Sequence, residues 1–377
     1  MIVFLILTFY VFIKCDKMLF TIMYFASFTF LAVFLFEVGF TNVEYLASDE
    51  WRFFHLSEIY LQEENDRTLW LYINVLLKNY DLFGEYFIKL LNIPFCVYLI
   101  HMVNSIFDIK NKLIVYLLAP FIIVLSISNL RDVLIFISTI HFCLAIDKLK
   151  TINIKSLIYL LFSAFLLFTL RPIILFVSIG LYLTVNFKNY FKNIFKNFIN
   201  IIFISVIFLS IIFYSSAYIN KILYNGSYFL TQGLAVKSEL KGFNQYFYPN
   251  NLPLTFSYAS LRYVITPMPT SIVERLFSDH FYKHGIISEI VRLFHQLIYF
   301  YLLFFMFFNL KKIYRLLKNL NSLYKLILLN LLVYMPIYTL YAFGGVHQRT
   351  KFPFQLALII IYVLYQQKKK NLITRKN

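Results

Sequence analysis

The amino-acid sequence predicts an all-α membrane protein, a polytopic bundle of about 11 transmembrane helices in one integral membrane domain over residues 1–377. Hydrophobic residues make up 60% of the chain and charged residues only 14%, whereas soluble domains are roughly 45–50% apolar. The apolar residues fall into runs separated by short basic hinges. Two longer polar segments, 37–85 and 215–286, interrupt these runs and predict two large periplasmic loops.

Eleven apolar runs are candidate membrane spans. The first run carries no basic residue before it and no small-residue cleavage site after it, so we expect a retained first span rather than a signal peptide. The runs lie at about 2–14, 19–36, 86–107, 113–128, 133–146, 157–170, 173–187, 199–214, 287–308, 326–343 and 354–366.

The basic residues predict the orientation of these spans. One set of hinges, with the tail from Gln367, holds twenty Lys and Arg but only three acidic residues. The opposite loops hold thirteen basic and fourteen acidic residues. Because basic residues concentrate in cytoplasmic loops, we expect the tail inside and the N-terminus outside. The net charge of +17 therefore follows from topology and does not indicate a nucleic-acid partner. The inner hinges are 14–18, 108–112, 147–156, 186–198 and 311–325.

The second large loop, 215–286, is too long for a simple connection, and long structured loops are usually functional. It contains turn-forming stretches such as Asn225-Gly226-Ser227 and Pro267-Met268-Pro269. We expect a partly helical external loop that caps a cavity between membrane helices.

The first large loop, 37–85, contains Asp49, Glu50 and Arg52, and its residues 69–77 predict a short helix lying along the interface. Two interpretations of the acidic pair remain open. The carboxylates could cap a helix N-terminus, or they could face the external cavity as a base or metal ligand.

Two hairpins, 113–146 and 157–187, have arms of only 13–16 residues. At ~1.5 Å per residue these arms reach roughly 20–24 Å, short of the ~30 Å hydrocarbon core. We therefore expect Arg131 and Arg171, in the outer turns, to lie below the membrane surface and face a cavity or a partner. Alternatively both snorkel to the interface, or Arg131 pairs with Asp132.

The span 287–308 has a polar outer end, which predicts a cavity wall, and Glu289 and Arg292 are spaced to pair on one helix face. The last external loop carries His347 and Arg349 just before a helix that we expect to start at Pro353. That loop is an anion site or an interfacial anchor.

The sequence contains no nucleotide-binding or hydrolase motif, and its three cysteines lack disulfide or zinc spacing. His280 and His284 have metal-ligand spacing, but no third ligand is evident. We therefore expect no metal and no cofactor.

The layout of the whole chain resembles the Wzy-type O-antigen and capsule repeat-unit polymerases. Asn129-Leu130-Arg131-Asp132, Leu170-Arg171-Pro172, Pro267-Met268-Pro269 and the loop at Arg349 look similar to local features of that family. The resemblance implies a multi-pass enzyme of the bacterial inner membrane that acts on the periplasmic face. It would transfer a growing glycan from undecaprenyl pyrophosphate to a lipid-linked repeat unit, without a metal or a nucleotide-sugar donor. A chain-length regulator protein would be a further partner.

This hypothesis assigns roles to ten residues. Guanidinium groups would stabilise the charge that develops on a leaving pyrophosphate in a low-dielectric pocket, and a carboxylate or imidazole would take the proton of the acceptor hydroxyl. The candidate bases are Asp49, Glu50, Glu289 and His347, and the candidate substrate-binding residues are Arg52, Arg131, Arg171, Arg262, Arg292 and Arg349.

Two other functions remain open. The acidic pair in the first loop also looks like the GT-C glycosyltransferases that use polyprenyl-phosphate sugars. A flippase of lipid-linked glycans would need charged residues through a central cavity, whereas here the polar residues cluster at the outer ends.

Overall fold

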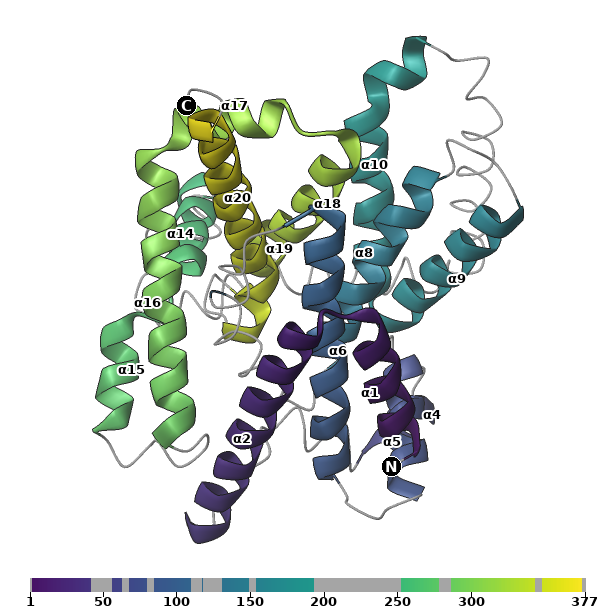
Figure 1. Ribbon diagram of the computed structural model, residues 1–377, viewed down its shortest axis with the longest axis vertical. Helices are drawn as coiled ribbons and strands as arrows, with labels where there is room; N and C mark the ends of the chain where they lie inside the picture. Colours follow the sequence, from purple (N-terminus) through teal and green to yellow (C-terminus); the bar gives the residue numbers. More distant parts are fainter. Residues whose placement is uncertain are drawn as a thin grey trace.

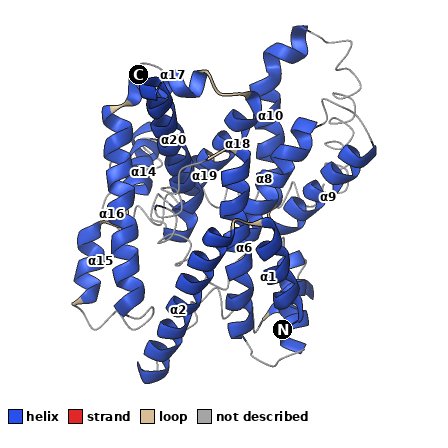
Figure 2. Ribbon diagram, viewed as in Figure 1, coloured by secondary structure: helices blue, strands red, loops and turns tan. Residues whose placement is uncertain are grey.

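The computed structural model describes a helical protein with no strand among its described residues (Figure 2). Three helical segments, Lys89–Ile106, Ile286–Phe308 and Ser322–Thr339, are long and apolar enough to cross a membrane. The predicted all-α class is therefore confirmed for the described residues, and the three segments are consistent with the predicted membrane character. The number of spans stays a prediction, and two of the predicted spans, 113–128 and 199–214, lie outside the described residues except for Leu117. The structure describes residues 2–41, 56–62, 68–79, 85–109, 117, 131–148, 154–192, 252–277, 286–342 and 348–374.

The helices follow the predicted apolar runs closely, and the two predicted loops contain short helices of their own. In chain order they are α1 (Ile2–Lys14), α2 (Lys17–Thr41), α4 (Ser57–Gln62), α5 (Thr68–Asn79), α6 (Glu85–Ile106), α8 (Asp132–Lys148), α9 (Ile154–Leu170), α10 (Pro172–Lys192), α14 (Leu252–Ile265), α15 (Pro269–Leu276), α16 (Ile286–Phe308), α17 (Leu310–Lys318), α18 (Ser322–Leu332), α19 (Tyr334–Ala342) and α20 (Gln348–Thr374) (Figure 1).

Two boundaries differ from the prediction, and proline is involved in both. The run 326–343 is divided between α18 and α19 at Val333. Pro336 lacks an N–H and its ring would clash with the carbonyl four residues earlier, at Leu332, so a continuous helix is disfavoured there. The last helix begins at Gln348 rather than at Pro353, which lies inside α20.

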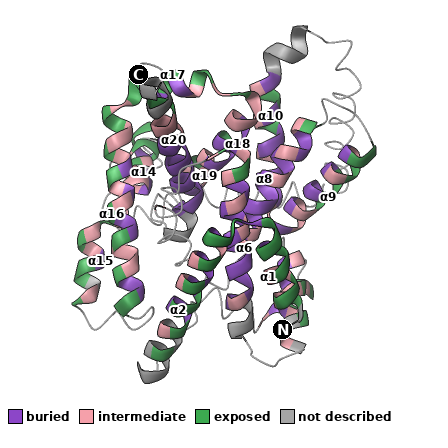
Figure 3. Cartoon of the chain, viewed as in Figure 1, coloured by how far each residue is buried: buried purple, intermediate pink, exposed green. Residues whose placement is uncertain are grey.

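Helix α8 lies at the centre of the molecule (Figure 3). Eleven of its seventeen residues are buried, and they lie on all sides of the helix. A helix that is apolar all round is buried in a protein core or spans a membrane. Helices α6, α9, α10, α18 and α20 pack around it.

The helix ends beside three of the predicted inner hinges lie close together. The ring of Phe107 lies 4.7 Å from that of Tyr324, and Gln367 Nε2 donates a hydrogen bond of 3.3 Å to the carbonyl of Asp108. Figure 1 shows α17 and the end of α20 at the top of the molecule. Three hinges that carry many of the basic residues therefore lie together.

The α1–α2 junction departs from that grouping. Figure 1 shows it about midway along the molecule rather than beside α17, and Tyr10 of α1 contacts Tyr98 in α6, with ring centroids 6.0 Å apart. Because α1 has 13 residues, it is only ~20 Å long. The hinge at 14–18 thus does not join the other predicted inner hinges.

Helix α5, in the predicted first loop, packs beside α6 and α9 with Trp70 and Leu71 buried, and α4 packs against α5. The helix predicted at 69–77 is therefore present as α5. Its position relative to a membrane stays a prediction.

Candidate functional site

The arginine that precedes α8 is held at the turn between α9 and α10. Arg131 is 6% exposed, and its Nη1 donates a hydrogen bond of 2.8 Å to the carbonyl of Leu170, the last residue of α9. Arg171 directly follows Leu170 in the sequence, and Pro172 is the first residue of α10. At that position the N–H that proline lacks would have no partner within the helix. The chain thus brings Arg131, just before α8, to the α9–α10 turn that contains Arg171.

The second arginine lies over an aromatic ring of α19. The guanidinium carbon of Arg171 is 5.6 Å from the centre of the Tyr338 ring, a distance suited to a cation–π interaction. Tyr338 stacks on Tyr334, with ring centroids 6.3 Å apart. We call Arg131, Arg171 and Tyr338 the arginine site.

An aromatic wall connects this site with α20. The ring of Phe136 in α8 lies 5.8 Å from Tyr334 and 5.4 Å from Phe352. Phe352 directly follows Lys351, which belongs to a second group of polar residues. The two groups are therefore neighbours on opposite sides of a packed apolar layer.

Lys351 anchors the second group. It is fully buried, and its Nζ donates hydrogen bonds to the carbonyls of Val264, at 3.1 Å, and Thr266. The rings of Tyr263 and Tyr299 lie 5.6 and 5.1 Å from the ammonium nitrogen. The last carbonyls of a helix have no partner within it and favour a cation, so Lys351 ties the end of α14 to α20.

Helix α16 contributes an ion pair and an imidazole to the same group. Arg292 Nη1 lies 3.0 Å from Glu289 Oε1, as the spacing predicted. His295 Nε2 lies 3.0 Å from Gln355 Oε1 on α20. We call this group the polar seam; its members are Glu289, Arg292, His295, Gln296, Lys351 and Gln355.

Several buried polar atoms of the seam have no hydrogen-bond partner among the described residues. They are Glu289 Oε2, both amide atoms of Gln296 and Gln355 Nε2. A buried polar atom without a partner costs about 1–3 kcal/mol, and such atoms are rare in native proteins unless a function explains them. One carboxylate oxygen and two amides supply the donors and acceptors that hydroxyl groups need. The seam thus has unused capacity for hydrogen bonds.

The structure divides the described candidate residues into these two groups. Arg131 and Arg171 belong to the arginine site, and Glu289 and Arg292 to the polar seam. Arg262 lies in α14 beside the seam, where its carbonyl accepts hydrogen bonds from Thr266.

Arg349 lies in the first turn of α20, two residues before Lys351. The other candidates, Asp49, Glu50, Arg52 and His347, lie outside the described residues.

Sequence reasoning missed Lys351, Gln355 and Tyr338 as members of these groups. Lys351 and Gln355 are spaced i,i+4 on an otherwise apolar segment, which is a detectable signal. Placing the helix start at Pro353 hid it, because Lys351 then belonged to a loop.

Among the described residues no group of three or more His, Cys, Asp or Glu could hold a metal ion. Comparison with family models, curated proteins and solved structures finds no match to this chain. A functional proposal therefore rests on the two groups and the sequence.

Proposed function

We propose that the chain is a glycosyltransferase that polymerises undecaprenyl-pyrophosphate-linked oligosaccharide repeat units for O-antigen or capsular polysaccharide, on the periplasmic face of the bacterial inner membrane. The arginine site is the observation that carries this proposal. It combines a buried guanidinium with a second arginine at the turn of a short hairpin.

Helix length supports a site below the membrane surface. Helix α9 has 17 residues, or ~25 Å at 1.5 Å per residue, against ~30 Å for the hydrocarbon core. An arginine at that depth keeps its charge and offers a planar fork that matches phosphate oxygens. Charge that develops on a leaving pyrophosphate is stabilised best by such preorganised donors in a low-dielectric environment.

The proposed step transfers the growing glycan to the new repeat unit. The acceptor hydroxyl oxygen attacks the anomeric carbon, the bond from that carbon to the pyrophosphate oxygen breaks, and a base takes the hydroxyl proton. Glu289 is the one candidate base among the described residues, but it belongs to the polar seam, across the apolar layer from the arginine site, so the proposal does not assign this step to it. Asp49, Glu50 and His347 are the other candidates. Arg131 and Arg171 hold the departing pyrophosphate, which leaves on its lipid.

A GT-C glycosyltransferase that uses a polyprenyl-phosphate sugar is the second candidate, favoured by the pair Asp49-Glu50. The glycan profile of a deletion strain separates the candidates. Loss of a polymerase leaves surface lipid capped by one repeat unit. Loss of a sugar-adding transferase truncates the unit, and loss of a flippase accumulates lipid-linked units inside the cell.

The decisive experiment complements that strain with Arg131→Lys and Arg171→Lys. A lysine keeps the charge but not the bidentate fork, so we expect roughly a 100-fold loss of long-chain glycan from each, comparable to removing one oxyanion donor. Arg315→Lys, at an exposed position on helix α17, is the matched control and should keep wild-type polymer. Membrane insertion is checked by immunoblotting. Wild-type polymer in both site variants would contradict the proposal.

A further inference from the structure

A short amphipathic helix lies across one end of the bundle. Helix α17, Leu310–Lys318, follows α16 after a turn at Asn309 and precedes α18. Figure 1 shows it across the upper end of α16 and α20. Its place is fixed by a 2.8 Å hydrogen bond from Lys325 Nζ to the carbonyl of Lys318, and Tyr365 of α20 lies 3.5 Å from Asn309.

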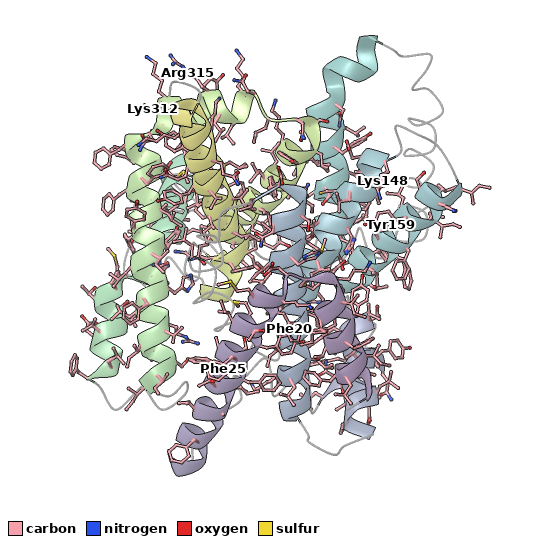
Figure 4. All side chains as sticks on the ribbon, in the orientation of Figure 1. Phe20, Phe25, Lys148, Tyr159, Lys312 and Arg315 are labelled. Atoms are coloured by element: carbon pink, nitrogen blue, oxygen red, sulfur yellow. The ribbon has the colours of Figure 1, made fainter. Side chains whose placement is uncertain are left out.

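The two faces of α17 differ sharply. Ile313 and Leu316 are buried against the bundle. Lys312 and Arg315 are exposed, and Figure 4 shows both pointing away from the bundle. The outward face therefore presents positive charge at a fixed position.

Large apolar side chains beside this basic face are exposed as well. They are Phe307 (68%), Phe308 (77%), Leu310 (60%) and Tyr314 (67%). A helix with apolar and aromatic groups on one side and lysine or arginine on the other lies in the plane of a membrane interface. The apolar side chains enter the acyl boundary and the cations remain among the headgroups.

Nothing in the nearby sequence neutralises this charge. Glu289 is the last acidic residue of the chain, and no described carboxylate lies within 4.0 Å of a basic side chain of α17. The end of α20 adds more exposed basic residues. We define the basic end as Lys311, Lys312, Arg315, Lys318, Lys368 and Lys369.

We propose that the basic end, with the exposed aromatic residues beside it, is a binding surface for anionic phospholipid. Juxtamembrane basic clusters attract anionic headgroups, and each basic residue adds to the affinity. This inference goes beyond the proposed function. It requires only that the chain is embedded in a membrane.

The test measures binding of fluorescent phosphatidylglycerol to the full-length protein in zwitterionic detergent micelles. Lys312→Gln with Arg315→Gln should weaken this binding about 30-fold, from the loss of two headgroup contacts. Phosphatidylcholine binding should be weaker than phosphatidylglycerol binding and unchanged by the variant. Added salt should weaken phosphatidylglycerol binding to the wild type, because it screens exposed charges.

Two control variants separate the position of the basic residues from their total charge. Lys17→Gln with Lys155→Gln removes the same charge from exposed positions on other helices and should bind like the wild type. Lys312→Arg with Arg315→Lys keeps the charge and should retain binding. Equal binding of both lipids, equal loss in the Lys17 and Lys155 variant, or displacement of the lipid by soluble glycerol phosphate would each overturn the proposal.

Discussion

The arginine site and the polar seam use one interaction in two ways. In both, a buried cation donates to the carbonyls at the C-terminal end of a helix: Arg131 at Leu170 of α9, and Lys351 at Val264 near the end of α14. That end of a helix dipole favours positive charge. The cations differ in shape, since an ammonium is a compact group with three donors, whereas a guanidinium is a planar fork with five.

This difference indicates separate roles. Lys351 commits two hydrogen bonds to the end of α14 and is enclosed by two tyrosine rings, so it holds the fold together. Arg131 donates to the last residue of α9, which Arg171 follows directly in the sequence, and the proposed function gives these two guanidinium groups a pyrophosphate to bind. The unused polar atoms of the seam lie not at Lys351 but at Glu289, Gln296 and Gln355. A buried cation near a proposed site is thus not itself a sign of ligand binding.

The largest effect expected from this comparison is on stability. Lys351→Ala removes a fully buried side chain and takes its hydrogen bonds from two carbonyls at the end of α14, of which Val264 keeps the Tyr299 hydroxyl as a partner. We expect a loss of about 3–5 kcal/mol in the free energy of unfolding, from the cavity and the lost hydrogen bonds together. Denaturant unfolding in detergent measures it. Lys312→Ala, at an exposed position, is the control and should change stability by less than about 0.5 kcal/mol. An equal loss of unfolding free energy in both variants would show that Lys351 does not hold α14 against α20.

The sequence predicts the helices well because their signal is local. Apolar runs, basic hinges and the spacing of Glu289 and Arg292 all depend on nearby residues, and α8, α9, α10 and α16 lie within a few residues of their predicted bounds. The apolar runs also predict that Arg171 lies in the turn between α9 and α10 and that Arg131 directly precedes α8.

The seam could not be predicted in the same way. His295 and Gln355 are sixty residues apart in the chain, and their contact depends on which face of α16 meets which face of α20. Helical periodicity identifies the polar face of a helix but not which other helix packs against that face. Lys351 was assigned to a loop because Pro353 resembled a helix start, yet α20 begins a turn earlier.

A second substitution separates a ligand-binding seam from a merely polar one. Gln296→Met replaces a buried amide, whose two polar atoms have no partner among the described residues, with an apolar side chain of similar length. We expect the free energy of unfolding to rise by about 1 kcal/mol, because the cost of burying that amide disappears. If the amide binds substrate, long-chain glycan falls in the same variant, a trade of activity for stability. Stability and polymer both unchanged would remove Gln296 from either role. Leu302→Met, at another fully buried position of α16, controls for the packing change.

The smallest effect concerns the arginine site itself. If the ring of Tyr338 stabilises Arg171 through a cation–π interaction, a double-mutant cycle of Tyr338→Leu and Arg171→Gln should give a coupling energy of about 1 kcal/mol. The cycle is needed because Tyr338 is nearly buried, so its truncation alone also creates a cavity. Tyr338→Phe keeps the ring and should keep the coupling. Tyr338→Leu with Arg315→Gln joins a buried residue of α19 to an exposed residue of α17, and their effects should add within about 0.5 kcal/mol. Additive effects in the Arg171 cycle as well would mean that the ring only fills space, and Arg171 would then depend on Arg131 and the α9–α10 turn for its position.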